Sequence, residues 1–336
     1  MKSLISTAKN YLSKLNFILG NKPKLLFYPK NIIRRFIPSP HKAALIISCD
    51  FELIWAKRFS RQIGCDLQKA QKIAGEERSN VPLILELCAR FDIPLTWATI
   101  GHLFLEDCSK ENNIAHKNMP RIAYFENKYW QFKTGDWFDS DPCCDFNNAP
   151  EWYAPDLVKM IVNSKIKHEI ACHTFSHVDC SEKNCLKEVL RGEISEYKKA
   201  ALKWGIDSKS FIFPGNLIGN LKVLKEEGFT SYRPDRRILG FPQKDKYGLW
   251  QIPTTAMIGP SSYRWDINYC LEKYKTIIER AIKYKRLCHF WFHPSTEKEF
   301  LETVLKNLFE TINNARKELH ITTMGAYTKY LENAEF

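Results

Sequence analysis

The 336-residue sequence lacks three features that would place it in a special class of protein. It has no run of about eighteen or more apolar residues, so we expect no membrane-spanning helix. It shows no repeat array, and its eleven cysteines follow no framework of repeated spacings. Scattered cysteines in odd number favour free thiols in a reducing compartment over a disulfide scaffold. With 44% hydrophobic residues, the chain is instead typical of a globular protein with a core.

Acidic residues are absent from the first 42 positions, which hold seven Lys and two Arg. This segment therefore carries nine of the twelve net positive charges, and the rest of the chain is nearly balanced. A balanced body gives no reason to expect nucleic-acid binding from the basic pI. We expect residues 1–41 to form a basic N-terminal extension and residues 42–336 to form the main domain.

An amphipathic helix is predicted between Leu4 and Leu19, where apolar residues recur at helical spacing. Three interpretations stay open: an interfacial anchor on anionic lipid, a helix packed on its own domain, and a targeting segment. In the first, residues 1–36 make a peripheral membrane contact, with Ile32 to Phe36 as a second patch. The compact order of a signal peptide is missing, so the expected location is the cytoplasm, at the inner face of a bacterial membrane.

The main domain is predicted to open with a buried strand over Ala43 to Leu53. Side chains alternate along a strand, so Ser48, Asp50 and Glu52 share one face. Two carboxylates at the end of an apolar strand either cap it in solvent or meet a cation or hydrogen-bond donors. Burying them without such partners is costly.

Strand and helix signals then alternate along the chain, which indicates a barrel or an open sheet of parallel strands. One helix is expected to begin at Val81, with Asn80 as its cap. Some seven strand signals are present, at residues 43–53, 95–100, 169–172, 211–215 with its turn, 229–234, 249–255 and 287–294. The alternation of strand and helix signals is interrupted at about 105–155 by an aromatic-rich insertion, which is typical of a lid or binding loop. Its aromatic residues either stack on sugar rings or pack the insertion onto the body.

His173 and His177 lie four residues apart, after the short apolar segment Glu169 to Cys172. On a helical turn this spacing puts both imidazoles on one face, within reach of one cation. The preceding segment is predicted to be a buried strand that delivers His173 to its carboxyl end, where sites in α/β folds lie. Alternatively, the histidines join nearby thiols in a closed structural zinc site made of Cys172, His173, His177, Cys180 and Cys185.

Four stretches of the sequence resemble the polysaccharide deacetylase, or NodB-homology, family and follow the family's order. They are Ser48 to Glu52, His168 to His177, Phe211 to Asn216 followed by Gly228 to Arg233, and Phe290 to Pro294. The first is similar to the branch of the family that carries Asp-x-Glu. The resemblance covers about residues 43–330 and implies a distorted (β/α) barrel of about seven parallel strands.

Carried over residue by residue, the resemblance implies that Glu52, His173 and His177 hold one divalent metal ion, with zinc expected. Asp50 would be the general base and His293 the general acid. Contacts with the substrate are expected from four further residues, namely Trp97, Pro214, Gly215 and Trp291.

The family's third motif usually carries an arginine directed at the base, and this chain departs from that pattern. It has Ile212 and Gly215 around Pro214. Arg233, at the end of the next strand signal, is expected to take the arginine's place beside Asp50. Without that contact Asp50 would lack its usual partner, which would put activity in doubt.

Together these features predict a metal-dependent enzyme that hydrolyses an N-acetyl or related acyl amide on a sugar. The expected setting is the biosynthesis of a surface polysaccharide or lipid-linked glycan, and a non-sugar amide substrate stays open. The alternative is a catalytically inactive member that binds a glycan or a partner through the same cleft. The missing third-motif arginine favours this alternative, and the family's fourth motif is matched only by Trp265 and Asp266.

Overall fold

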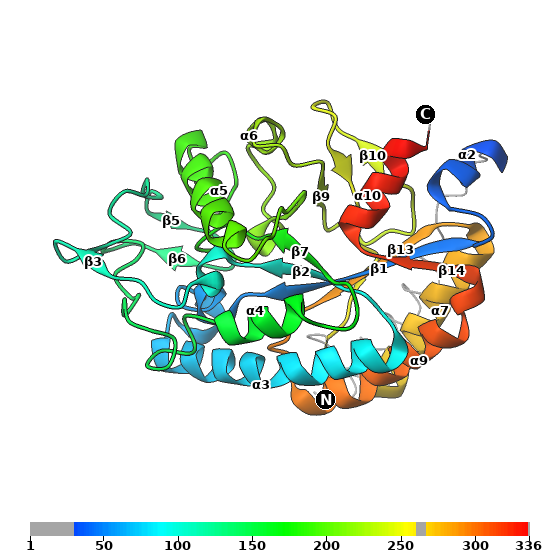
Figure 1. Ribbon diagram of the computed structural model, residues 1–336, viewed down its shortest axis with the longest axis horizontal. Coiled ribbons are helices and arrows are strands. Elements are labelled where there is room, and N and C mark those ends of the chain that lie inside the picture. The colour runs from blue at the N-terminus through cyan, green and yellow to red at the C-terminus, as the bar shows by residue number, and fades with distance from the viewer. Residues whose placement is uncertain (1–29, 260–266, 335–336) are drawn as a thin grey trace, which may run out of the picture.

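The computed structural model describes residues 30–259 and 267–334. A curled sheet runs through the molecule in the order β10-β11-β9-β8-β7-β2-β1-β13-β12, and β14 pairs with β1 (Figure 1). All pairings in it are parallel except that between β10 and β11. Its strands are β1 (Ala43–Phe51), β2 (Thr96–Thr99), β7 (Glu169–Cys172), β8 (Ser210–Ile212), β9 (Ser231–Arg233), β10 (Gln243–Lys244), β11 (Trp250–Gln251), β12 (Ala256–Met257), β13 (Leu287–Phe292) and β14 (Leu319–Thr322). This is the distorted (β/α) barrel that the resemblance implied.

Helices pack against the outside of the curled sheet, with α3 and α9 along one side in Figure 1 and α5 and α10 on the other. The helices are α2 (Lys30–Phe36), α3 (Leu67–Phe91), α4 (Pro155–Val162), α5 (Lys187–Leu202), α6 (Leu221–Glu226), α7 (Ile267–Tyr284), α8 (Lys298–Phe300), α9 (Lys306–Asn314) and α10 (Met324–Asn333). No helix among the described residues is long and apolar enough to cross a membrane.

Strand β1 lies near the middle of the sheet and is buried on both faces. Leu45, Ile47 and Cys49 join the large core between the sheet and the helices. Ala44 and Ile46 join the smaller core on the opposite face of the sheet. Because strand side chains alternate, Ser48 and Asp50 continue the row of Ala44 and Ile46. The same alternation that buries the strand therefore aims a carboxylate into the barrel.

The segment from Trp250 to Met257 connects the two sides of the curled sheet. Its first residues pair with β9 and its last residues pair with β13. Between them, the Thr255 N–H donates to the His289 carbonyl oxygen at 2.7 Å. Strand β9, which carries Arg233, and strand β13, which His293 follows, are thereby held around one barrel interior.

Two local predictions are wrong or incomplete. The helix expected at Val81 begins at Leu67, where the Asp66 carboxylate accepts hydrogen bonds from two backbone N–H groups of the first turn. Asn80 lies inside this helix, and its side-chain amide donates to the carbonyl oxygens of Pro294 and Thr296. The short strand β14 was not predicted.

The insertion at about 105–155 forms two small antiparallel sheets beyond the ends of β1 and β2 (Figure 1). One pairs β3 (Lys110–Glu111) with β4 (Ile114–Ala115), and the other pairs β5 (Phe125–Glu126) with β6 (Gln131–Phe132). Trp130 and Trp137 of the insertion are almost fully buried. Packing of the insertion onto the body therefore accounts for these two indole rings.

Helix α2 packs on the barrel at the end opposite the insertion. The Tyr327 hydroxyl donates to the Phe36 carbonyl oxygen, and the Phe36 ring stacks on Phe241 with centroids 4.4 Å apart. Phe36, expected in the membrane-contacting patch, therefore packs against its own domain. The helix predicted at Leu4 to Leu19 lies outside the described residues.

Candidate active site

Side chains from four strands and the residues that follow them converge at the carboxyl ends of β1, β7, β9 and β13. A cleft of about 850 Å³ opens there. Its lining includes Asp50, Glu52, His177, Gly215, Trp291 and His293. Asp50 and His293, 243 positions apart in the sequence, thus share one cavity, as expected for the site of an α/β barrel.

Asp50 and Arg233 form a buried bidentate ion pair. The Arg233 Nη1 and Nη2 atoms lie 2.5 and 2.6 Å from the two Asp50 carboxylate oxygens. Burial alone would raise the pKa of Asp50, but the charge and hydrogen bonds of Arg233 outweigh it and lower the pKa below its ordinary value. Arg233 thus makes the contact with Asp50 that was expected of it.

Arg233 is itself held by its surroundings. Its Nη1 atom also donates to the Ser48 hydroxyl at 3.0 Å, and the Ser48 oxygen lies 2.9 Å from His289 Nε2. The guanidinium carbon lies 4.8 Å from the centroid of the Trp291 ring. Stacking on an aromatic face suits a planar, delocalised cation. Trp291 therefore contacts the arginine as well as lining the cleft.

Glu52 meets both histidines of the His-x-x-x-His pair. One carboxylate oxygen, Oε1, lies 3.1 Å from His173 Nε2 and 3.1 Å from His177 Nε2. The His173 Nδ1 atom lies 2.7 Å from the Ile212 carbonyl oxygen, which only accepts, so Nδ1 carries the proton. In neutral His173 the Nε2 lone pair then faces the carboxylate oxygen. This arrangement requires a proton or a cation between the two acceptors.

His173 and His177 reach Glu52 from a loop, and the helical turn predicted for them is absent. The loop follows β7, and Thr174 and His177 both have positive φ, near 62° and 64°. A β-branched residue in that region is strained and must be held by its surroundings. The Thr174 hydroxyl accepts the His177 N–H at 2.9 Å, and buried Glu193 of α5 accepts from the N–H groups of Phe175 and Ser176.

His293 follows β13 and lies on the other side of Glu52. Its Nε2 atom is 3.7 Å from Glu52 Oε2, and the Lys57 ammonium is 3.4 Å from the same oxygen. Burial opposes ionisation of Glu52, but Lys57, His293 and His177 together hold its pKa well below the ordinary value. Burial lowers the pKa of His293, with Glu52 opposing that shift. Asp50, Glu52 and His293 also stand close enough to share one cation.

Two of the residues expected to bind substrate do not line the cleft. Trp97 is fully buried and belongs to the core between the sheet and the helices, with its ring against Phe51. The prediction for Trp97 is wrong because strand alternation turns it away from the barrel interior, toward which its neighbour Ala98 points. Pro214 is likewise buried and is not part of the cleft lining. Gly215 and Trp291 line the cleft.

The closed Cys/His zinc site considered for residues 172–185 is not formed. Among the described residues, the groups with metal-ligating geometry that contain His173 or His177 include Glu52 and no cysteine. Cys180 is buried with its thiol directed at the Val178 carbonyl oxygen, 3.5 Å away. Trp265 and Asp266, the candidates for the fourth motif, lie outside the described residues.

Lys57 and Trp130 also belong to the site. Lys57 was not singled out from the sequence, and Trp130 was considered only as one of the aromatic residues of the insertion. One short turn, η1 (Leu53–Ala56), separates Lys57 from Glu52, and no sequence pattern predicted this turn. Trp130 comes from the insertion, donates its indole N–H to the Ala56 carbonyl oxygen, and packs edge-on against His177 with centroids 5.0 Å apart. A Cβ on Gly215 would lie 2.5 Å from the Trp130 ring, so the close approach requires glycine.

Comparisons with known proteins identify the fold. No protein-family model matches the chain, and no curated protein matches it. A solved structure assigned as a polysaccharide deacetylase from Pseudomonas aeruginosa PAO1 superposes with a TM-score of 0.61 at 12% identity, over 92% of this chain and all of that one. One assigned to the same class from Mycobacterium smegmatis gives 0.59 at 13%, over 88% and 93%. Puue allantoinase gives 0.61 at 14%, over 93% and 100%.

The chain therefore has the fold of the polysaccharide deacetylases, which allantoinase shares. The resemblance to the NodB-homology family, first drawn from four short stretches of sequence, is confirmed at the level of the fold.

Proposed function

We propose that this chain is a metal-dependent hydrolase that removes an N-acetyl or related acyl group from a sugar. The observation that supports the proposal most directly is the position of Glu52 Oε1, 3.1 Å from the Nε2 atoms of both His173 and His177. Asp50 and His293 border the same point from β1 and β13. An ionised carboxylate and an imidazole beside the group of Glu52, His173 and His177 serve proton transfer, which a protein that only binds a ligand does not require.

The three residues fit a divalent cation. Two imidazole nitrogens and one carboxylate oxygen are the donor set of hydrolytic zinc sites, which leave positions open for water and substrate. The Nδ1–H of His173 is anchored to a carbonyl oxygen, as is usual for metal-ligating histidines. Burial lowers the pKa of His177 to about 4, so its ring is neutral near pH 7 and its nitrogen is available. A cation bound there polarises an amide carbonyl and lowers the pKa of water.

Asp50 and His293 divide the proton transfers between them. Arg233 keeps Asp50 ionised, so its carboxylate accepts a proton from the attacking water. His293, when protonated, gives a proton to the departing nitrogen, since an amine leaves poorly without one. Asp50 lies at the carboxyl end of β1, and His293 follows the carboxyl end of the neighbouring strand β13. The arrangement supports an active enzyme over an inactive binding member, because the base retains its arginine.

A sugar substrate is supported by the names of two structural neighbours and by the cleft lining. Both neighbours are assigned as polysaccharide deacetylases. Tyr129, which is 39% exposed, contributes aromatic surface to the cleft, on which the apolar face of a sugar ring can stack. We place the reaction in the formation of a surface polysaccharide or lipid-linked glycan, in the cytoplasm at the inner membrane face.

The test combines metal analysis with acetate release from an N-acetylglucosamine oligomer, for wild type, Glu52→Gln and His173→Ala. We expect each variant to lose one metal equivalent together with acetate release. The control is His168→Gln, at the opposite end of β7, which should keep both. Allantoin is assayed beside the oligomer. Turnover of allantoin alone would reassign the substrate to a small cyclic amide, and the full wild-type metal content in both variants would refute the proposed centre.

A membrane role for the N-terminal extension is tested separately. Residues 1–29 hold five Lys and no acidic residue. We propose that this charge draws the enzyme to anionic lipid. Sedimentation with vesicles of anionic lipid should fall when residues 1–29 are removed, and unchanged sedimentation would remove the basis for a peripheral location.

A further inference from the structure

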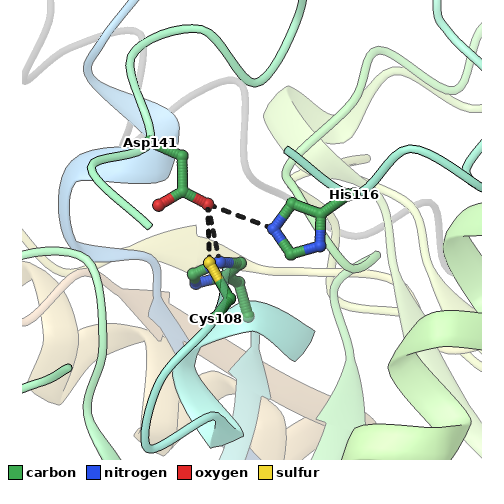
Figure 2. A group of neighbouring side chains, drawn as sticks. Cys108, His116 and Asp141 are labelled. Atoms are coloured by element: carbon green, nitrogen blue, oxygen red, sulfur yellow. Dashed lines mark hydrogen bonds and ion pairs between the residues drawn. The ribbon is translucent and has the colours of Figure 1, made fainter. Parts of the chain in front are cut away.

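A second group of metal-ligating side chains lies outside the cleft. His102, Cys108, His116 and Asp141 each offer one ligand atom, and these four atoms lie within 4.8 Å of one another. None of the four residues lines the cleft. Figure 2 shows Cys108 and His116 directed at the same carboxylate oxygen of Asp141.

Three donor atoms surround that one oxygen, Asp141 Oδ2. His102 Nε2 lies 2.9 Å from it, His116 Nε2 3.1 Å and Cys108 Sγ 3.5 Å. The other carboxylate oxygen, Oδ1, is engaged differently. It accepts the N–H of Cys143 at 3.0 Å and the hydroxyl of Tyr153 at 3.2 Å. The carboxylate is therefore fixed by one oxygen while the other faces the cluster.

The tautomer of His102 makes its contact with Asp141 unfavourable without a cation. Its Nδ1 atom lies 3.1 Å from the Trp152 carbonyl oxygen, which only accepts, so Nδ1 carries the proton of the neutral ring. The Nε2 atom is fully buried and makes no hydrogen bond of acceptable geometry. Its lone pair thus meets a carboxylate oxygen at 2.9 Å, out of contact with water. Buried polar atoms in that position call for a compensating partner.

We propose that His102, Cys108, His116 and Asp141 form a structural zinc site. Bonds of about 2.1 Å to nitrogen and oxygen and about 2.3 Å to sulfur give a tetrahedron with edges of roughly 3.4 to 3.6 Å. The three measured edges of 2.9, 3.1 and 3.5 Å reach that size with outward shifts of a few tenths of an ångström. Two imidazoles, a thiolate and a carboxylate suit Zn²⁺ better than Mg²⁺ or Ca²⁺, which prefer oxygen ligands.

Four protein ligands close the coordination shell, so this site has no position for substrate. The hydrogen bond from His102 Nδ1–H to a carbonyl oxygen and the anchored Oδ1 of Asp141 are the outer contacts that such ligands usually have. His102 belongs to η3 (Gly101–Phe104), directly after β2, whereas the other three ligands belong to the insertion. The ion would therefore fasten the insertion, and with it Trp130 of the cleft, to the barrel.

Cobalt substitution tests the site independently of the proposed activity. The full-length protein is stripped with a chelator and reloaded with Co²⁺, and thiolate-to-cobalt charge transfer is recorded in the near ultraviolet. Only the insertion site has a sulfur ligand, so the band reports on it alone. We expect about two cobalt equivalents in wild type. Cys108→Ser should lose one equivalent and the band, and Asp141→Asn should weaken both.

The matched control is Cys144→Ser, a thiol in the same loop that is directed at the Asp145 carbonyl oxygen and not at Asp141. This variant should keep the band. Glu52→Gln should keep the band while losing one equivalent and acetate release, which separates this inference from the proposed function. Absence of the band from folded wild type, or its survival in folded Cys108→Ser, would overturn the assignment. Absence in wild type would instead indicate that a protonated imidazole pairs with Asp141.

Discussion

Replacing Arg233 by methionine tests how much the buried ion pair contributes to stability and to the state of the base. The side chains of Arg233 and Asp50 are 0% and 4% exposed, so the small values measured for surface pairs do not apply. Removing one partner of such a pair leaves an uncompensated buried charge, which costs about 3–5 kcal/mol. We therefore expect Arg233→Met to lower the free energy of unfolding by that amount in urea titrations.

The double variant Asp50→Asn/Arg233→Met removes the orphaned charge together with its partner. It should be more stable than Arg233→Met by at least about 1 kcal/mol, although it lacks the base. Arg233→Met should also raise the pKa of Asp50, because burial is then opposed only by the smaller effects of His173 and His293. The acid limb of the acetate-release profile should move to higher pH. A loss below about 1 kcal/mol in the single variant, or no recovery in the double variant, would refute this account of the pair.

Three further outcomes follow from the structure. Gly215→Ala, at φ near 57° and with a Cβ 2.5 Å from the Trp130 ring, should lose about 1–2 kcal/mol in urea unfolding and raise KM for the oligomer. An unchanged free energy of unfolding and an unchanged KM would mean that Trp130 is not closely packed against residue 215. His168 accepts the Leu95 N–H through Nδ1, and burial lowers the pKa of His168 to about 4. Between pH 4 and 6.5 the unfolded chain therefore binds more protons than the folded chain. The free energy of unfolding consequently falls as the pH drops through this window. His168→Gln should flatten that fall by up to about 1.4 kcal/mol per pH unit, and an identical slope would contradict the assigned pKa. Asp66→Ala removes the cap of α3 and should lower the urea midpoint of unfolding in the same assay, and Asp66→Asn is the control that keeps most of the cap.

The fold was predictable where burial imposes a pattern on the sequence. The apolar runs at β1, β7 and β13 are bounded by polar residues, and all three form strands at the expected places. The start of α3 was missed because its first turns are polar. They carry little apolar periodicity, and Asp66 decides where the helix begins. Strand β14 is short, and it forms because the edge of β1 is available beside it.

The site was predictable to the extent that its residues sit next to strand ends. Asp50, Glu52 and His173 follow directly from strand alternation and from a family pattern. Arg233 was proposed only because it ends the next strand signal, since its reach across the barrel depends on the curvature of the sheet. The four proposed zinc ligands, one in η3 and three in the insertion, are separated by irregular loops of unequal length, so neither periodicity nor spacing in the sequence grouped them. These four residues are recognised as one group only from their positions in three dimensions.

The pairing of β1 has a consequence for synthesis of the chain. All nine residues of β1 are buried, yet Ala44 pairs with Leu287, about 240 residues later. At ribosomal rates of about 5–20 residues per second, the nascent strand waits on the order of 12 to 48 s for that neighbour. During this interval an apolar edge is exposed to other chains. We therefore expect soluble yield to depend on growth temperature and chaperone supply more than on the stability of the finished barrel.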